Sequence, residues 1–567
     1  MNKILIQKTT QLWKTKLIVF SGFLILLLII GSSVAMAEDD SQNPRLASND
    51  PDFAQYQGDE TPTQPEPSLD GHKAGLTPES VNLSHLSSIS VPIVSAPASY
   101  DLRTLDKVTS VKDQGDAGVC WTFASYASLE SYLMHGENWN FSENNMKNLL
   151  SSAYSEGFDR NANDGGNRLQ ATAYLTRWSG PVEESDDPYS DSSEVSPENL
   201  SVKKHVQNVL FLPDRNGSLD NEAIKWAVQN SGATYTTMCY NGTSYSSTNY
   251  TYYYSGSSNT NHAVAIVGWN DTFDRNKFSQ VPPGDGAFIV KNSWGETWGE
   301  NGYFYVSYYD SKIGTSNAVF TAKNSGNYKS IYQYDPFGWT NSLGYTGLTT
   351  AWGANVFTAK SDELLKAVSF YTTDSNCNYE IYVYTNVSSS PINQTGPIFT
   401  KNGSTSVAGY YTISLDSDVQ LTADQNFSVV LNLTNLDYGY PLAIEEPISG
   451  AGGSSKATAN SDESFLSSNG QTWTDLTVYY PNTNVCIKAF TDPVLPVFPG
   501  CTNPPTDPDQ DGLYEDITGN GILDFNDVVT YYDNTYWIKN TAPVAFFDYN
   551  NNNLTDFSDV VILYDMI

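Results

Sequence analysis

Cysteine, histidine and basic residues are scarce in this chain. There are five cysteines and five histidines in 567 residues, and 29 Lys and Arg stand against 63 Asp and Glu, which gives a formal charge of −34. The acidic balance argues against nucleic acid as a partner, because phosphates are bound by Lys and Arg. Few cysteines in an odd number exclude a disulfide framework and leave room for a reactive thiol.

Long apolar runs are absent after residue 30, so no later segment of the sequence can cross a bilayer as a helix. The N-terminus combines four lysines, an apolar run over Leu17–Ile30 and the small residues Ala35-Met36-Ala37. This pattern predicts a secretory signal peptide cleaved after Ala37, and hence a secreted protein or one associated with the cell surface. A retained membrane anchor is the alternative. Several Asn-x-Ser/Thr triplets, such as the one at Asn140, predict a glycoprotein.

The length of the chain predicts several domains. Helical spacing precedes strand-like runs in the second quarter of the sequence, which predicts an α+β domain. Short β-branched and aromatic runs then alternate with turn residues, which predicts an all-β sandwich of the jelly-roll type. The predicted segments are 1–37 for the signal peptide, 38–97 for a pro-segment or linker, 98–323 for the α+β domain, 330–492 for the β-sandwich, 493–506 for a Pro-rich linker, and 507–567 for a small α-helical calcium-loop module.

One cysteine stands where a nucleophile is expected. Cys120 lies at the point where a glycine-containing loop enters a predicted helix, and a helix N-terminus lowers the pKa of a thiol. His262 opens the stretch NHAVAIVGWN and is the candidate base. Asn292 can accept the second imidazole N–H and orient the ring. Gln114 offers a side-chain amide that can bind an oxyanion together with the Cys120 N–H. A buried structural thiol is the alternative for Cys120.

These motifs resemble the papain-like cysteine peptidases, and the resemblance covers Ala98–Lys323. It implies a two-lobed fold with Cys120 and His262 facing across a cleft, and peptide-bond hydrolysis through an acyl-enzyme. The residues that carry it are Gln114-Gly115, Cys120-Trp121, Asn261-His262-Ala263 and Asn292-Ser293-Trp294-Gly295.

Three features bear on how far the resemblance extends. Gly165-Gly166 resembles the glycine pair of the family, whose backbone pairs with an extended substrate, and an ordinary turn is the alternative. Ala117 and Val119 depart from the family, which usually has a disulfide-bonded cysteine and a small serine at these positions. The familiar long helical inhibitory pro-segment is not visible in residues 38–97, so the sequence leaves the mechanism of latency open.

The β-rich segment resembles the lectin-like domain that follows the peptidase in some prokaryotic exported papain-like enzymes. The matching stretches are LLKAVSFYTTDSNCNYEIYVYT and SSNGQTWTDL. Carbohydrate binding and structural packing are both compatible with its aromatic residues. Two disulfides compete in this part of the chain, Cys377–Cys486 and Cys486–Cys501, and Cys239 has no obvious partner.

The C-terminal segment contains a repeat, DITGNGILDFND at Asp516–Asp527 and DYNNNNLTDFSD at Asp548–Asp559. Twelve-residue loops with oxygen ligands at positions 1, 3, 5, 9 and 12 suit Ca²⁺. Gly521 supplies the sharp turn, and Asn553 replaces it because asparagine tolerates positive φ. An acidic solvated face is the alternative. The predicted ligands are Asp516, Thr518, Asn520, Asp524 and Asp527, then Asp548, Asn550, Asn552, Asp556 and Asp559, with Asp507, Asp509 and Asp511 as a third, overlapping site.

Asp at position 12 of these loops resembles a dockerin repeat. The resemblance implies docking onto a cohesin-type partner or a neighbouring domain, and a calcium-stapled cap is the simpler alternative. The sequence as a whole therefore predicts a secreted cysteine endopeptidase that acts on proteins or peptides and needs no cofactor for catalysis. The competing hypothesis is a non-enzymatic cell-surface adhesion protein with a vestigial peptidase fold.

Overall fold

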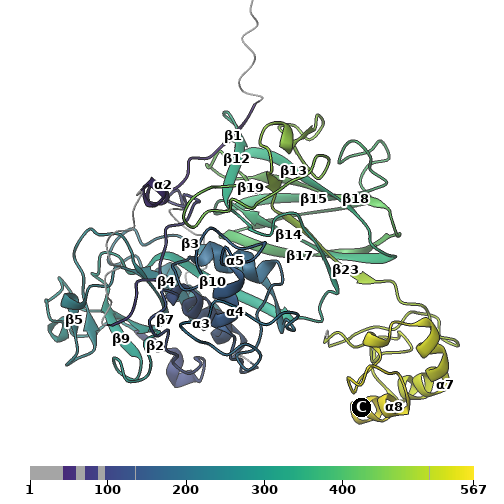
Figure 1. Ribbon diagram of the computed structural model, residues 1–567, viewed down its shortest axis with the longest axis horizontal. Coiled ribbons are helices and arrows are strands. Elements are labelled where there is room, and N and C mark those ends of the chain that lie inside the picture. The colour runs from purple at the N-terminus through teal and green to yellow at the C-terminus, as the bar shows by residue number, and fades with distance from the viewer. Residues whose placement is uncertain (1–42, 59–70, 87–95, 135, 510) are drawn as a thin grey trace, which may run out of the picture.

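The computed structural model describes residues 43–58, 71–86, 96–134, 136–509 and 511–567 (Figure 1). Within these ranges no helix is long and apolar enough to cross a membrane. The predicted signal peptide lies outside them. The N-terminal part of the described chain, residues 43–58 and 71–86, contains strand β1 (Pro44–Leu46) and helix α2 (Pro51–Gly58).

The α+β domain begins after this segment and has the predicted order of helices before strands. Helix α3 is buried on nearly all sides, because it packs between α4 and α5 on one side and strands β4, β7 and β10 on the other. Its elements are β2 (Ser99–Asp101), α3 (Cys120–Leu133), α4 (Glu143–Leu149), α5 (Arg168–Thr176), β3 (Lys204–Leu212), α6 (Glu222–Ser231), β4 (Thr234–Met238), β5 (Tyr245–Ser246), β6 (Thr251–Tyr252), β7 (His262–Asn270), β8 (Ala287–Lys291), β9 (Tyr303–Ser307) and β10 (Thr315–Asn324).

The following domain is a β-sandwich, as the sequence predicts. Apolar side chains of β14, such as Phe370, share one core with side chains of β15 and β18, such as Ile381 and Leu431. Its strands are β11 (Ser330–Tyr332), β12 (Asn341–Tyr345), β13 (Thr350–Thr358), β14 (Glu363–Thr372), β15 (Cys377–Thr385), β16 (Phe399–Thr405), β17 (Ala408–Leu421), β18 (Asn426–Thr434), β19 (Leu442–Glu445), β20 (Ser464–Ser467), β21 (Thr474–Asp475), β22 (Asn484–Val485) and β23 (Ile487–Pro493).

The two domains share one sheet, which the sequence does not predict. Residues 408–411 of β17 pair antiparallel with residues 208–211 of β3. A thirteen-stranded sheet therefore runs through both domains in the order β11-β23-β14-β17-β3-β10-β4-β7-β8-β9-β6-β5, with β2 on β7. A six-stranded sheet, β16-β15-β18-β13-β20-β21, forms the other face of the sandwich.

The N-terminal segment adds to the β-domain before it reaches the α+β domain. Strand β1 pairs antiparallel with β12, so the order of the four-stranded sheet is β1-β12-β19-β22 (Figure 1). Asn49 also forms an isolated bridge with Val81, which holds the two described halves of the segment together. Residues 43–58 and 71–86 thus form a strap attached to both domains; we call them the N-terminal strap.

Both disulfides proposed for the β-domain are wrong, because all five cysteines are free in the structure. Cys377 packs in the core of the sandwich, whereas Cys486 packs in the core that the β-domain shares with the α+β domain. Cys501 contacts a third core, in the C-terminal module. The chain is likewise divided at Cys486 into β22 and β23, which belong to different sheets.

The C-terminal module is a separate unit that follows β23 (Figure 1). Helices α7 (Phe525–Thr541) and α8 (Phe557–Asp565) pack together over their own small core. Each helix begins with an aspartate N-cap and a capping box, formed by Asp524 with Asp527 and by Asp556 with Asp559. Lys329 of the preceding domain donates a hydrogen bond to the Gly512 carbonyl at 2.7 Å and so ties the module to the sandwich.

Candidate active site

Cys120 is the first residue of α3 and is fully buried. The N-cap residue, Val119, makes no side-chain cap, so the thiol lies beside the unsatisfied N–H groups of the first helical turn. The backbone N–H of Ala263 donates to the Cys120 Sγ atom at 3.3 Å. Two lobes of the α+β domain therefore meet at this sulfur, since Ala263 lies in β7 and follows His262 directly.

His262 is the first residue of β7, and its ring is oriented by Asn292. The His262 Nε2 atom lies 2.8 Å from Asn292 Oδ1. The amide oxygen is an acceptor, so Nε2 carries the proton and Nδ1 keeps its lone pair. Among the described residues, Nδ1 has no hydrogen-bond partner. Trp294 stacks on the imidazole at a centroid distance of 4.7 Å and excludes water from this hydrogen bond.

The environment of His262 favours the neutral imidazole. Burial lowers its pKa to about 4, the hydrogen bond with Asn292 opposes this shift, and the nearby His72 adds to it. The imidazole is therefore neutral at neutral pH in this state, and Nδ1 is available to take a proton.

Gln114 lies next to these residues and is fully buried. Its Nε2 atom donates to the Ala117 carbonyl at 2.9 Å and is 3.4 Å from the Lys73 carbonyl of the N-terminal strap. Its Oε1 atom accepts the Ser293 hydroxyl at 2.7 Å. The structure thus brings together all four residues that the sequence predicts as catalytic.

Gly166 pairs with an extended segment that belongs to the chain itself, and Gly165 packs against the same segment. Gly166 N–H donates to the Gly75 carbonyl at 3.2 Å, and the Gly166 carbonyl accepts from Thr77 N–H at 3.0 Å. Leu76 thereby forms a parallel bridge with Gly166. A Cβ atom on Gly165 would lie 2.5 Å from the Thr77 side chain, so only glycine permits this approach.

The N-terminal strap also covers the predicted catalytic residues. His72 stacks on the face of Trp294 at 5.1 Å with an interplanar angle of 3°, and its Nδ1 atom is 2.9 Å from the Gly115 carbonyl. Gly75 packs against the backbone of Gly118 so closely that an added Cβ would lie 2.3 Å from the Gly118 carbonyl carbon. His72, Lys73 and Gly75 of the strap thus all lie against residues next to Cys120 or Asn292.

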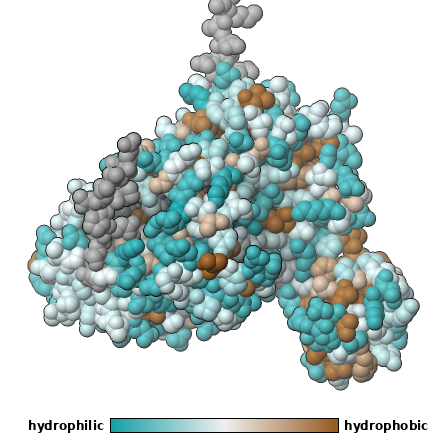
Figure 2. All heavy atoms as spheres, viewed as in Figure 1, coloured by the Kyte–Doolittle hydropathy of each residue, from teal (hydrophilic) through white to brown (hydrophobic). Residues whose placement is uncertain are grey.

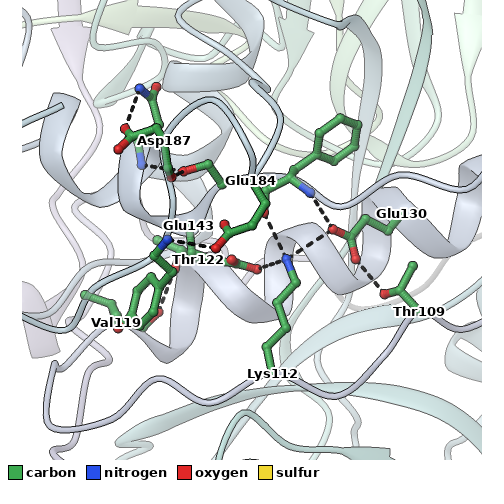
Figure 3. Close-up of polar contacts among 12 residues, drawn as sticks. Thr109, Lys112, Val119, Thr122, Glu130, Glu143, Glu184 and Asp187 are labelled. Atoms are coloured by element: carbon green, nitrogen blue, oxygen red, sulfur yellow. Dashed lines mark hydrogen bonds and ion pairs between the residues drawn. The ribbon is translucent and has the colours of Figure 1, made fainter. Parts of the chain in front are cut away.

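A buried ion network joins α3 and α4 to the loop that precedes α3 (Figure 3). Lys112 Nζ lies 2.7 Å from Glu143 Oε1 of α4 and 3.4 Å from Glu130 Oε1 of α3. Glu130 also accepts the Thr109 hydroxyl at 2.5 Å. Burial alone would lower the pKa of Lys112, but the two carboxylates raise it by more than burial lowers it. The pKa of Lys112 therefore lies above its usual value, and the lysine stays charged. The network fixes the loop that carries Gln114, which follows Lys112 by two residues.

The predicted calcium loops have matching geometry in the C-terminal module. Asp516 accepts the N–H groups of Asn520 and Gly521, and Asp548 accepts those of Asn552 and Asn553. Gly521 and Asn553 both have positive φ, +85° and +62°, as the sequence predicts.

Position 12 of each loop is also buried. Asp527 and Asp559 accept two backbone N–H groups each, at positions 3 and 9 of their loops. Neither receives a hydrogen bond from a lysine or arginine among the described residues. Buried carboxylates without a cationic side chain are the donor set that Ca²⁺ takes. The position-9 residues, Asp524 and Asp556, cap α7 and α8.

Four further carboxylates converge at the start of the module. Asp507, Asp509, Asp511 and Glu515 each offer an oxygen within 4.8 Å of the others. Burial and the three neighbouring aspartates raise the pKa of Glu515 to about 8, and burial raises that of Asp507 to about 6. The sequence analysis missed Glu515, although it stands at position 9 of a loop counted from Asp507. These residues fit a cation in charge and ligand type.

Known proteins match two parts of the chain. Residues 96–322 match the family described as papain family cysteine protease, and residues 331–491 match the lectin like domain. Vignain of Phaseolus vulgaris is 30% identical over 226 residues, which are 37% of this chain and 54% of the relative. Cysteine proteinase 2 of Entamoeba histolytica is 28% identical over 226 residues, 37% of this chain and 63% of the relative. The chain spans about half the length of the curated relatives it matches.

Two solved structures extend the likeness over both domains. One contains the cysteine protease and lectin-like domains of Cwp84, a surface layer associated protein of Clostridium difficile. It has a TM-score of 0.67 and 25% identity, and covers 80% of this chain and 98% of that one. The other is the clostridial cysteine protease Cwp84 after propeptide cleavage, with a TM-score of 0.59 and 27% identity, covering 70% of this chain and 99% of that one.

Proposed function

We propose, from the premise that residues 96–322 are a papain family cysteine protease domain, that this chain is an exported peptidase that hydrolyses peptide bonds through Cys120, His262 and Asn292. One observation carries the proposal. The His262 ring is held by Asn292 at 2.8 Å, while the next residue along β7 donates its N–H to the Cys120 sulfur at 3.3 Å. Nucleophile, base and orienting group are thus in one constellation.

The chemistry follows from this geometry. Cys120 gives its proton to His262 Nδ1, and the thiolate attacks the carbonyl carbon of the scissile bond at the N-terminus of α3. The oxyanion receives hydrogen bonds from the Cys120 N–H and from Gln114 Nε2, which in this state faces the Lys73 carbonyl. His262 then protonates the leaving amine. Water hydrolyses the resulting thioester with His262 again as base, and the thiol is restored.

The N-terminal strap acts as the inhibitory pro-segment in this proposal. It pairs with Gly166 and covers Cys120, although it lacks a long helix. The similar protein Cwp84 has a solved structure determined after propeptide cleavage, and a pro-segment in this chain would lie before residue 96, where the strap stands.

The first test is hydrolysis of a mixed peptide library under reducing conditions. The full chain is expressed with a site-specific protease site introduced between residues 86 and 96, and is then cut there. We expect cleavage that a thiol alkylator blocks. A folded protein that cleaves no peptide, before or after the cut, would instead favour the adhesion hypothesis.

The C-terminal module is proposed to bind Ca²⁺ and to dock onto a partner. Large apolar side chains are exposed on both of its helices, and Figure 2 shows hydrophobic surface gathered on this module. Phe525 of α7 lies near Tyr564 of α8, and Tyr532 lies near Phe557, with ring centroids about 6 Å apart in both pairs. An exposed apolar face of this kind supports a protein-docking role, with a cohesin-type protein or a cell-surface component as the partner.

Removing Ca²⁺ is expected to unfold this module. Without a cation the buried carboxylates of each loop repel, whereas bound Ca²⁺ stabilises the folded state by about 3 kcal/mol at 100 times its Kd. Limited proteolysis in EDTA should therefore cut the module at least ten times faster than in Ca²⁺. The double variant Asp516→Ala and Asp548→Ala should behave in Ca²⁺ as the parent does in EDTA. Asp533→Ala, an exposed position on α7, is the matched control. Equal cutting rates in both buffers would contradict the calcium assignment.

Carbohydrate binding by the lectin-like domain is a further part of the proposal. Trp352 and Tyr382 stack at 5.6 Å on the outer face of the six-stranded sheet, and Trp473 packs edge-on against Trp352. All three rings are half-buried, so they offer an aromatic surface on which a sugar ring can stack.

A further inference from the structure

Arg168 begins helix α5 immediately after the glycine pair that binds the N-terminal strap. The residue between them, Asn167, caps the helix with its side-chain oxygen and donates from its Nδ2 atom to the Pro78 carbonyl at 3.0 Å. The strap therefore follows the start of α5 residue by residue, from Gly166 past Asn167 to Arg168. A peptide that pairs with Gly166 passes the same side chains.

The guanidinium of Arg168 is fixed by its own domain on two sides. Nη1 donates to the Asn317 carbonyl at 2.5 Å, and the guanidinium carbon lies 5.0 Å from the centre of the Phe211 ring. The remaining edge faces the strap. Nε and Nη2 donate to the two carboxylate oxygens of Glu79 at 2.8 and 3.1 Å, a bidentate pair. Among the described residues, Glu79 is the acidic partner that Arg168 has within 4.0 Å.

This contact lies in a pocket of about 250 Å³ between the strap and the α+β domain. The strap contributes three acidic side chains to the lining, Asp50, Asp52 and Glu79. The domain contributes two cations, Arg168 and Lys312, and one acid, Asp214. Asp214 accepts the Ser316 N–H at 2.8 Å. When the strap leaves, the pocket wall keeps a net positive charge, and two N–H groups of a buried arginine lose their acceptor.

Tyr235 of β4 lies on the neighbouring part of the sheet, because it pairs with Ala318, the residue after Asn317. The Tyr235 side chain is completely buried, and its hydroxyl has no hydrogen-bond partner among the described residues. Tyr235, Cys120 and Phe211, the ring on which Arg168 lies, belong to one hydrophobic core. The Arg168 pocket thus adjoins the core that holds the reacting sulfur.

We infer that the Arg168 pocket is an acid-selective subsite, which binds an aspartate or glutamate side chain of the substrate in the place that Glu79 occupies in the strap. The inference rests on the proposed peptidase function and names its substrate class. A substrate carboxylate restores the bidentate pair with Nε and Nη2, whereas an uncharged side chain leaves those buried donors unpaired. Arg168 is thus a specificity-determining residue, and the strap imitates the substrate at this position.

The test compares peptides that differ only in whether one side chain ends in a carboxylate or in an amide. A peptide library is digested with the full chain cut between residues 86 and 96, and we expect Asp and Glu to be enriched at one fixed position beside the scissile bond. Two peptides with Glu or Gln at that position should then differ at least tenfold in kcat/KM, since buried charged hydrogen bonds are involved. Cleavage without any acidic preference would overturn the inference and leave the peptidase function standing.

Two variants and one binding measurement complete the test. Arg168→Gln should bring the Glu-to-Gln ratio of kcat/KM close to one, and Arg168→Glu should reverse it in favour of a basic side chain. An unchanged ratio in folded Arg168→Gln would also overturn the inference. Independently of catalysis, the Cys120→Ala protein, cut between residues 86 and 96, is tested for binding of a peptide of residues 71–86. This peptide should bind at least ten times more tightly than the same peptide with Glu79→Gln. Such binding, together with no hydrolysis by the cut protein that keeps Cys120, would support the subsite and overturn the peptidase function; equal binding of both peptides would overturn the subsite.

Discussion

Cys120→Ala is expected to lower kcat/KM for peptide hydrolysis by about 10⁴-fold or more, because nucleophile and base act as a unit and the loss of either removes the covalent path. The substitution removes one sulfur at the start of α3 and leaves the caps and the ion network of Lys112 unchanged. Circular dichroism and thermal unfolding should therefore match those of the parent. The measurement is the initial rate on one fluorogenic peptide after removal of the strap.

Cys239→Ala is the matched control for this prediction. Cys239 is also a buried thiol of the α+β domain, but burial raises its pKa and keeps it protonated. Its replacement should change the rate by less than about threefold, since the thiol takes no part in the reaction. Hydrolysis by Cys120→Ala at the parental rate would mean that another group performs the chemistry.

Gly75→Val is expected to raise the peptidase activity of the uncut chain by about ten- to 100-fold. A Cβ at this position would lie 2.3 Å from the Gly118 carbonyl carbon and 2.6 Å from the Val119 nitrogen. Both atoms belong to the backbone that leads into α3, so the strap must move and not the domain. A clash of this kind weakens docking by about 1–3 kcal/mol, and each 1.4 kcal/mol is a factor of ten.

Gly58→Val separates this effect from a general disturbance of the strap. Gly58 ends α2, and a Cβ there would have no atom within 4 Å. Its activity should equal that of the parent chain. The rates are taken before self-cleavage, with mass spectrometry used to show that the strap is still attached. Equal activity of the Gly75→Val chain and its parent would show that the strap does not control access to Cys120.

The catalytic constellation could be predicted from the sequence because its chemistry prescribes residue types in a fixed order. Cys120 precedes a helix, His262 opens a strand, and Asn292 follows another strand, so local patterns place each of them at the end of an element. These residues are far apart in the sequence, but the motifs around them indicate that they meet in the folded chain. The twelve-residue repeats of the C-terminal module likewise predict the tight turns at Gly521 and Asn553, whereas calcium binding by these loops stays a prediction.

The N-terminal strap could not be predicted in this way. Its contacts depend on the pairing of Leu76 with Gly166 and on the fit of Gly75 against Gly118. Glycine and leucine in a polar segment carry no local signal for such contacts. Glu79 is one of many acidic residues in an acidic chain, and only its position opposite Arg168 distinguishes it.

The wrong disulfide predictions have a related cause. Cys377 and Cys486 both lie in strand-like runs, and the sequence does not say which core each run faces. The chain turns at Cys486, whose N–H donates to the Ala443 carbonyl at 3.1 Å. Its thiol therefore packs against the α+β domain, out of reach of Cys377 in the sandwich.

The sheet shared by the two domains also determines how long β3 lacks one of its partner strands during synthesis of the chain. Residues 208–211 of β3 pair with residues 408–411 of β17, so the partner strand is made about 200 residues later. At about 5–20 residues per second, a ribosome needs roughly 10–40 seconds to supply it. After β10 has paired with one edge of β3, the other edge still lacks the strand that covers it until β17 is made, and exposed edges invite pairing with other chains. The peptidase domain is thus most prone to aggregation before the lectin-like domain has been synthesised. Once that domain has folded, its strand β17 covers the free edge of β3 and protects the peptidase domain from pairing with other chains.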